Sequence, residues 1–172
     1  MNALVEVHKN NIIHCDIKPQ NFLIFYNEDS NFELNELDAD FSFSSYDPRS
    51  YLKLTDFGLS HFVPINNSKA FMKYRCGTFG YSAPEVGKET YIDPSIDMWA
   101  FGITLYQMAV AYLPTAIKQY RYGSGPLPFR KIDWNPFNFE KIKSLIESCV
   151  QIKPEKRISA AEAINHQWFE MD

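Results

Sequence analysis

The stretch that decides the fold reads HCDIKPQN over residues 14–21, and it is followed by DFG at residues 56–58 and GTFGYSAPE at residues 77–85. Alone, each stretch says little, because an Asp in a turn or a surface Lys is common. Together they supply two carboxylates, an ammonium and an amide, from Asp16, Asp56, Lys18 and Asn21. Phosphoryl transfer requires oxygen ligands for magnesium, a carboxylate facing the acceptor hydroxyl and a cation beside the transferred group. The combination favours that chemistry.

The three stretches, in this order, resemble the catalytic loop, the metal-binding triplet and the end of the activation segment of protein kinases. DMWAFG at residues 97–102 is similar to the start of the central buried helix of the kinase C-lobe, and HQWF at residues 166–169 to its final helix. Lys18 and Thr78 resemble the serine/threonine branch more than the tyrosine branch. The resemblance implies a mostly α fold with a short β-hairpin, namely a kinase C-lobe over residues 1–172.

The resemblance also implies a role for each matching residue. Asp16 would orient the substrate hydroxyl and accept its proton, and Lys18 would neutralise charge on the transferred phosphoryl group. Asn21 and Asp56 would hold magnesium ions that bridge the phosphates of ATP. Leu23 occupies the position where the family places an apolar residue beneath adenine. ATP and Mg²⁺ are therefore the expected cofactors of the full kinase.

Two other sets of residues have expected structural roles within the same resemblance. Arg157 is similar to the arginine that pairs with the glutamate of the third stretch, here Glu85, and this pair would anchor the activation segment to the helical lobe. Asp97 would hydrogen-bond the backbone around His14 and Cys15 and so fix the catalytic loop. His14 itself is expected to be a packed, hydrogen-bonded core residue.

The N-lobe of a kinase is not recognisable in this chain. A glycine-rich loop, a strand lysine and a helix glutamate belong to that lobe, but only thirteen residues precede His14 and no G-x-G-x-x-G lies among them. Residues 1–9 resemble only the last turns of the helix that leads into the catalytic loop. We therefore expect an N-lobe or another subunit to cover the cleft face, and the isolated chain to have negligible activity and weak nucleotide affinity.

Position 15 departs from the family pattern, because Cys15 stands where most members carry an arginine. That arginine usually binds a phosphate on the activation segment. The position where such a phosphate usually lies is Tyr74, rather than Ser or Thr. We therefore expect that phosphorylation at this position does not switch on activity.

Residues 27–48 form an acidic segment with seven Asp or Glu residues and no Lys or Arg. It is rich in Asn, Ser and Asp, which favours a solvated loop inserted within the domain. Apolar runs of strand length flank it at residues 22–26 and 51–54, so two short strands joined by this insertion are predicted.

Helical patterns follow downstream. A helix capped by Ser95 or Asp93 is predicted to run to about Tyr112, where Pro114 stops it. Residues 139–150 have the apolar spacing of an amphipathic helix. A capping box at residues 159–162 begins a last helix.

Composition narrows the class of protein further. The 172 residues carry 17 basic and 21 acidic side chains for a net charge of −4, and 45% of them are hydrophobic. These values favour a globular domain and argue against disorder and against a basic nucleic-acid binder. Residues 98–117 lack formal charge but are too polar for a membrane span. Three cysteines far apart do not suggest a disulfide framework or a zinc site, so an intracellular, cytoplasmic location is expected.

Three functions are consistent with these features. The first is a serine/threonine protein kinase that transfers phosphate from Mg-ATP to a protein hydroxyl and is represented here by its catalytic lobe. The second is an inactive kinase-like C-lobe that serves as a structural or scaffold subunit of a larger assembly. The third is a binding module that holds basic partners through the acidic insertion. The expected partner is a protein substrate or an assembly partner, with no nucleic acid and no membrane.

Overall fold

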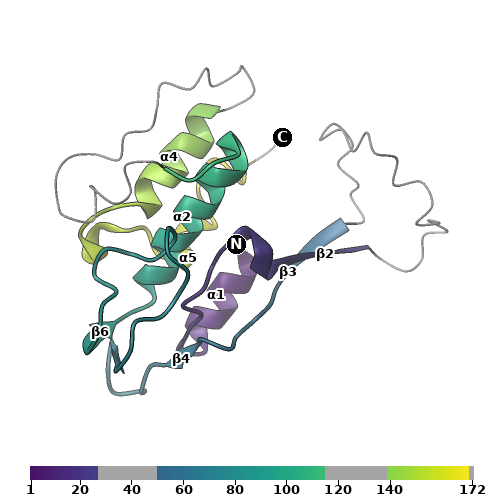
Figure 1. Cartoon of the computed structure of the whole chain (residues 1–172). Helices are drawn as coiled ribbons and strands as arrows, with labels where there is room; N and C mark the ends of the chain where they lie inside the picture. The colour runs from purple at the N-terminus through teal and green to yellow at the C-terminus, as the bar shows by residue number, and fades with distance from the viewer. Residues whose placement is uncertain (27–49, 115–138, 171–172) are drawn as a thin grey trace.

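The computed structural model describes residues 1–26, 50–114 and 139–170. Its α-helices and strands, in chain order, are α1 (Asn2–Lys9), β1 (Ile12–Ile13), β2 (Phe22–Tyr26), β3 (Ser50–Leu54), β4 (His61–Phe62), β5 (Ala70–Met72), β6 (Thr90–Ile92), α2 (Ser95–Val110), α4 (Phe139–Cys149) and α5 (Ala160–Ala163). Two 3₁₀ turns, at Pro19–Asn21 and Pro154–Lys156, complete the described elements. The helices gather into one body, and β2 and β3 extend away from it (Figure 1).

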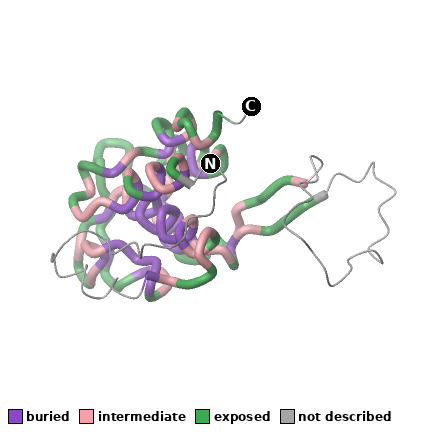
Figure 2. The backbone as a smooth tube through the Cα atoms, turned by 90° about the horizontal axis from the view of Figure 1, so that it is seen from above, coloured by how far each residue is buried: buried purple, intermediate pink, exposed green. Residues whose placement is uncertain are grey.

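Helix α2 forms the centre of the core. Its residues from Ile96 to Thr104 are all buried, including the large side chain of Trp99. Helix α4 packs against α2, and the close approach depends on Gly102. A Cβ atom at this position would lie 2.6 Å from Cγ2 of Val150 and 2.7 Å from Cβ of Cys149. Figure 2 shows this buried centre surrounded by more exposed chain.

The two ends of α2 differ slightly from the sequence prediction. At the start, the N-cap residue is Pro94 rather than Asp93 or Ser95, and no side chain caps the helix, although the Oδ1 atom of Asp93 accepts a hydrogen bond from the backbone N–H of Ser95 at 3.0 Å. At the other end the helix stops at Val110, two residues before the predicted Tyr112. The reason is local, because Ala111 adopts a left-handed conformation with φ of 64° and closes the helix before Pro114 is reached.

The strands that the structure describes form three separate antiparallel pairs. The predicted hairpin is confirmed as β2 paired with β3, with Phe22 opposite Leu54 and Tyr26 opposite Ser50. Its joining segment, residues 27–48, lies outside the described residues. The pairs β1–β4 and β5–β6 are additional to the one hairpin that was predicted. Each of these four strands has only two or three residues, too few for a recognisable alternation of apolar side chains.

The C-terminal helices agree with their sequence signals. Residues Ile142, Leu145, Ile146 and Cys149 of α4 are all buried, as the amphipathic spacing predicts. The capping box is present, because the Ser159 hydroxyl accepts from the backbone N–H of Glu162 while the Glu162 carboxylate accepts from the backbone N–H of Ser159. Helix α5 is nevertheless short and ends at Ala163. Within the described ranges, no helix has both the length and the apolar character to cross a membrane.

Candidate active site

A buried carboxylate fixes the loop that follows β1. Asp97, in the first turn of α2, accepts hydrogen bonds from the backbone N–H groups of His14 at 2.7 Å and Cys15 at 2.8 Å. The same carboxylate lies 3.0 Å from Nε2 of His8 in α1. Only 1% of Asp97 is exposed, so these bonds hold the loop against the core. The predicted contact between Asp97 and the loop backbone is confirmed.

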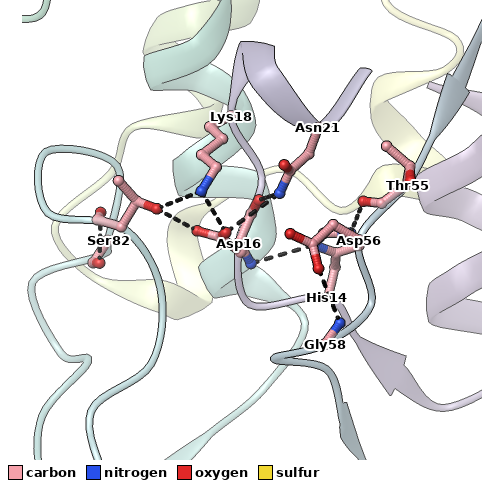
Figure 3. A network of polar contacts seen from close by, with 9 residues as sticks. His14, Asp16, Lys18, Asn21, Thr55, Asp56, Gly58 and Ser82 are labelled. Carbon is pink, nitrogen blue, oxygen red and sulfur yellow. Dashed lines mark hydrogen bonds and ion pairs between the residues drawn. The ribbon is translucent and has the colours of Figure 1, made fainter. Parts of the chain in front are cut away.

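The next residue, Asp16, lies at the centre of a network of polar side chains (Figure 3). The Lys18 ammonium donates to Oδ2 of Asp16 at 2.7 Å and to the Thr78 hydroxyl at 2.8 Å. That hydroxyl donates in turn to Oδ1 of Asp16 at 2.7 Å. Three side chains from two distant segments therefore close a ring, in which both oxygens of one carboxylate are hydrogen-bonded.

This environment keeps Asp16 ionised. Burial of the carboxyl group acts to raise its pKa, and it is the largest single effect. The hydrogen bonds from Lys18 and Thr78, the charge of Lys18 and a further hydrogen bond from Asn21 together outweigh it, so the pKa of Asp16 lies below its ordinary value. Asp16 is thus a carboxylate at neutral pH, although only 6% of the residue is exposed.

Asn21 is buried beside Asp16, and its amide orientation is set by two acceptors. Its Nδ2 group donates to the backbone carbonyl of Asp16 at 2.8 Å and to Oδ2 of Asp16 at 3.3 Å. Since both acceptors require the NH₂ group on that side, the Oδ1 atom of Asn21 points away from them. The Oδ1 atom of Asn21 is therefore a neutral oxygen that could serve as a metal ligand at the edge of the network.

Asp56 is held beside the same loop by contacts of the residues before and after it in the chain. The backbone N–H of Thr55 donates to the carbonyl of Asn21 at 2.9 Å, and the carbonyl of Thr55 lies 3.0 Å from Nε2 of His14. On the other side, the Phe57 ring packs edge-on against the His14 ring with centroids 4.7 Å apart. Asp56 itself is exposed and has a φ of 63°, a left-handed conformation that is uncommon outside glycine. Such strain persists only where surrounding contacts enforce it.

These contacts bring together four of the five predicted site residues: Asp16, Lys18 and Asn21 within one network, and Asp56 next to a residue bonded to it. The fifth, Leu23, lies two residues beyond Asn21 on β2 and is 47% exposed. As an apolar side chain on the projecting hairpin, it takes no part in the polar network. His14 is fully buried and hydrogen-bonded, as expected.

Thr78 is the functional side chain that sequence reasoning did not place. In the sequence analysis, Thr78 served only to indicate the serine/threonine branch. Its place within the GTFGYSAPE stretch, two residues after Cys76, was the one sequence feature that could have pointed to a role at the site. The ring with Asp16 and Lys18 depends on bringing together residues about 60 positions apart, which only the tertiary fold reveals.

Oxygen donors are the groups that suit a metal ion at this site. Within the described part of the chain, no group of three or more His, Cys, Asp or Glu side chains is placed to hold a metal. The candidate ligands are instead the Asp56 carboxylate and the Oδ1 atom of Asn21. Carboxylate and amide oxygens match the preference of Mg²⁺, which keeps several of its waters and takes few protein ligands.

The third stretch is anchored to the helical core at its end. The buried Arg157 guanidinium donates to both oxygens of the Glu85 carboxylate, which confirms the predicted pair. Earlier in the stretch, Gly77 has a φ of 83°, and a Cβ atom there would lie only 2.6 Å from the carbonyl oxygen of Cys15. Glycine is therefore required for this segment to lie against the loop that carries Asp16.

Comparison with known proteins agrees with this arrangement. The protein kinase domain family matches residues 1–169. The chain is 33% identical to the serine/threonine-protein kinase cds1 of Schizosaccharomyces pombe, over 98% of this chain and 34% of that protein. It is 30% identical to the serine/threonine-protein kinase RAD53 of Saccharomyces cerevisiae, over 99% of this chain and 20% of that protein. It is 32% identical to the calcium/calmodulin-dependent protein kinase type I of Schizosaccharomyces pombe, over 98% of this chain and 45% of that protein.

The chain thus spans less than half the length of each of these relatives. The match nonetheless runs through the whole described fold, from α1 to the residues after α5. It includes the loop that carries Asp16, the Asp56 triplet and the Glu85–Arg157 anchor. On this evidence the chain belongs to the protein kinase family.

Proposed function

We propose that this chain carries the catalytic lobe of a serine/threonine protein kinase, which transfers the terminal phosphoryl group of Mg-ATP to a protein hydroxyl. The observation that supports this most directly is the Asp16 carboxylate, held ionised by Lys18, Thr78 and Asn21 beside the Asp56 segment. Its chain neighbours are fixed by Asp97, so the carboxylate is positioned in advance. Positioning of this kind supplies most of the catalysis in phosphoryl transfer.

Asp16 and Lys18 have complementary roles in this proposal. An ionised Asp16 accepts a hydrogen bond from the substrate hydroxyl, orients it and takes its proton as the oxygen attacks. The Lys18 ammonium, which donates to Asp16 and Thr78, would offset negative charge on the transferred group. Thr78 acts as a positioning residue, because it contacts both of them.

The metal-binding role is proposed for two residues that offer oxygen ligands. Asp56 and the Oδ1 atom of Asn21 would hold Mg²⁺, which supplies positive charge to the phosphates of ATP when bound. The orientation of the Asn21 amide supports this, because its NH₂ group is committed to Asp16. Leu23 is the proposed apolar contact for adenine, and its exposure on β2 leaves it available for one.

The proposed domain is a C-lobe over residues 1–172, with residues 27–48 as an insertion within it. No G-x-G-x-x-G motif precedes residue 14, so an N-lobe or another subunit would cover the face that carries the β2–β3 hairpin. The exposed apolar side chains of Leu23, Ile24 and Leu52 on that hairpin are consistent with a covered surface. They equally favour a second candidate, a kinase-like lobe that acts as a scaffold through this face.

Activity measurements on a longer protein that contains residues 1–172 and an N-lobe test the proposal. Asp16→Asn should lower kcat for peptide phosphorylation by about 10²- to 10⁴-fold, the usual contribution of a general base. The exposed Glu6→Gln is the matched control and should retain wild-type activity. Residues 1–172 alone should not bind Mg-ATP at micromolar concentration in calorimetry.

Different results would favour the scaffold instead. A longer protein that assembles with a partner equally well before and after the Asp16→Asn substitution, and that transfers no phosphate in either form, would contradict the enzymatic proposal. Micromolar binding of Mg-ATP by residues 1–172 alone would contradict the requirement for a second lobe.

A further inference from the structure

The turn that presents Thr78 is held together through one backbone carbonyl. The carbonyl oxygen of Thr78 accepts hydrogen bonds from the backbone N–H groups of Tyr81 at 3.1 Å and Ser82 at 3.3 Å. The Ser82 hydroxyl, which lies beside the network of Asp16 (Figure 3), donates to the same oxygen at 3.0 Å. Residues 78, 81 and 82 therefore move together, and the position of this turn decides where the Thr78 hydroxyl lies.

Tyr81 connects this turn to the central helix. Its hydroxyl donates a hydrogen bond to the side-chain oxygen Oε1 of Gln107, in the last part of α2. Tyr81 is only 5% exposed, whereas Gln107 is partly buried. Burial raises the pKa of the Tyr81 hydroxyl above its ordinary value, so the group remains a donor at neutral pH. A buried phenol requires such a partner, so Gln107 fixes the side of α2 against which the turn lies.

We propose that Tyr81 is a positioning residue, which couples Gln107 of α2 to the Asp16 carboxylate through Thr78. The coupling runs over consecutive hydrogen bonds. Tyr81 binds Gln107 through its hydroxyl and the Thr78 carbonyl through its backbone N–H. The Thr78 hydroxyl then donates to Oδ1 of Asp16 at 2.7 Å. Tyr81 lines one small cavity together with Asp16 and Thr78, so the three side chains are neighbours in space as well.

The effect of the Tyr81 hydroxyl should be confined to this turn. Further along the chain, the Glu85 carboxylate accepts two hydrogen bonds from Arg157 and holds the end of the stretch on the helical core. Loss of the Tyr81 hydroxyl would therefore loosen the turn without detaching the stretch. A small shift is sufficient, because a hydrogen bond weakens steeply as its angle departs from linear. The Thr78 hydroxyl would then stabilise the charged form of Asp16 less well.

The pKa of Asp16 in the 172-residue chain tests the coupling without any measurement of activity. Tyr81→Phe keeps the ring and removes the hydroxyl. Carboxyl NMR as a function of pH should show that the lowered pKa of Asp16 rises towards its ordinary value in this variant. Tyr91→Phe is the matched control, because it removes a hydroxyl from a tyrosine that is 63% exposed. The control should leave the pKa of Asp16 unchanged, and an unchanged pKa in Tyr81→Phe would overturn the proposal.

A double-mutant cycle shows whether the effect passes through Thr78. Thr78→Val removes the donor to Asp16, so the further change Tyr81→Phe should shift the pKa of Asp16 no more. Gln107→Leu removes the acceptor of the Tyr81 hydroxyl at a position that is only partly buried. It should raise the pKa as Tyr81→Phe does, and it repeats the test at a site that tolerates substitution. Additive shifts in the double variants would show that Tyr81 acts on Asp16 directly, which contradicts the proposed route.

The consequence for activity rests on the proposed function and is measured separately. In a longer protein with kinase activity, Tyr81→Phe should lower kcat by up to about tenfold, the rate equivalent of one hydrogen bond, and leave the KM for Mg-ATP unchanged. Tyr91→Phe should retain the wild-type kcat. A raised KM for Mg-ATP would indicate a general loss of structure and refute the positioning role. A raised pKa of Asp16 in a protein that transfers no phosphate would support the coupling and count against the kinase proposal.

Discussion

Arg157 donates two parallel hydrogen bonds to Glu85, at 2.5 Å from Nη1 to Oε1 and at 2.8 Å from Nη2 to Oε2, although 72 residues separate them. The Arg157 side chain has no exposed surface, whereas 26% of Glu85 is exposed. The guanidinium also donates to the backbone carbonyls of Gln151 and Ser95, and it lies 5.1 Å from the Trp99 ring. One cation thus ties the end of the GTFGYSAPE stretch to α2 and to the segment after α4.

Removal of Glu85 should destabilise the fold. Glu85→Ala leaves a buried guanidinium without its counter-ion, and breaking such a pair typically costs about 3–5 kcal/mol. We expect the lower end of that range, because carbonyl acceptors for Arg157 remain. Urea denaturation measures the change in the free energy of unfolding.

Another ion pair in the same chain is the control for this variant. Lys9 and Glu6 are 2.8 Å apart in α1, but about two thirds of each side chain is exposed. Glu6→Ala should cost less than about 1 kcal/mol, as exposed pairs do. Equal losses for Glu6→Ala and Glu85→Ala would show that burial of Arg157 does not govern the anchor.

The hydroxyl of Thr78 should set the acidity of Asp16. Thr78→Val keeps the shape of the side chain but removes the donor to Oδ1, so the pKa of Asp16 should rise towards its ordinary value. Thr78→Ser retains a hydroxyl and should restore the lowered pKa. Carboxyl NMR of Asp16 as a function of pH measures both variants, and an unchanged pKa in Thr78→Val would refute the role of this bond.

Stability should fall in acid partly through the same carboxylate. The pKa of Asp16 is lower in the folded chain than in the unfolded chain, where it is about 3.9. Its stabilising contribution is therefore complete above that value and is lost as the pH falls through the lowered pKa of the folded state. Asp16→Asn should reduce the slope of the unfolding free energy in this acidic window, by at most ~1.4 kcal/mol per pH unit. If the unfolding free energy depended on pH with the same slope in the wild type and in Asp16→Asn, the stabilising contribution of the Asp16 carboxylate would be contradicted.

The contact between α2 and α4 should tolerate no side chain at Gly102. Gly102→Ala places a methyl group within 2.7 Å of atoms of Val150 and Cys149, and overpacking of this kind costs about 1–3 kcal/mol. Gly87→Ala is the matched control, because its Cβ atom would meet nothing closer than 3.9 Å. Thermal unfolding should show a lower Tm for Gly102→Ala alone.

Much of this fold follows from patterns within single segments. The hairpin of β2 and β3 follows from two apolar runs of strand length, and α4 from its apolar spacing. Two long-range contacts, Asp97 to the loop backbone and Glu85 to Arg157, were predicted from the resemblance to protein kinases. Such features need only a recognisable pattern in the chain, whether it is a period, a cap or a motif.

The remaining features depend on tertiary contacts that no local pattern encodes. The pairs β1–β4 and β5–β6 are too short to show a period, so their pairing depends on the surrounding fold. The ring that joins Thr78 to Lys18 and the close approach of Gly77 to the Cys15 carbonyl connect residues about 60 positions apart. Each of them arises because the third stretch lies against the loop, and that approach is visible only in three dimensions.

The hydrogen bond from Thr78 to Asp16 couples the proton affinity of the Asp16 carboxylate to the position of the segment that carries Thr78. Whatever draws residue 78 away, such as a docked peptide or a bound protein, removes a donor and must raise the proton affinity of the carboxylate. By reciprocity, protonation of Asp16 in acid weakens the interaction that holds the segment of Thr78 against the loop, and it does so by the same free energy. Proton uptake on ligand binding, measured by calorimetry in buffers of different ionisation enthalpy, would therefore report whether that segment has moved.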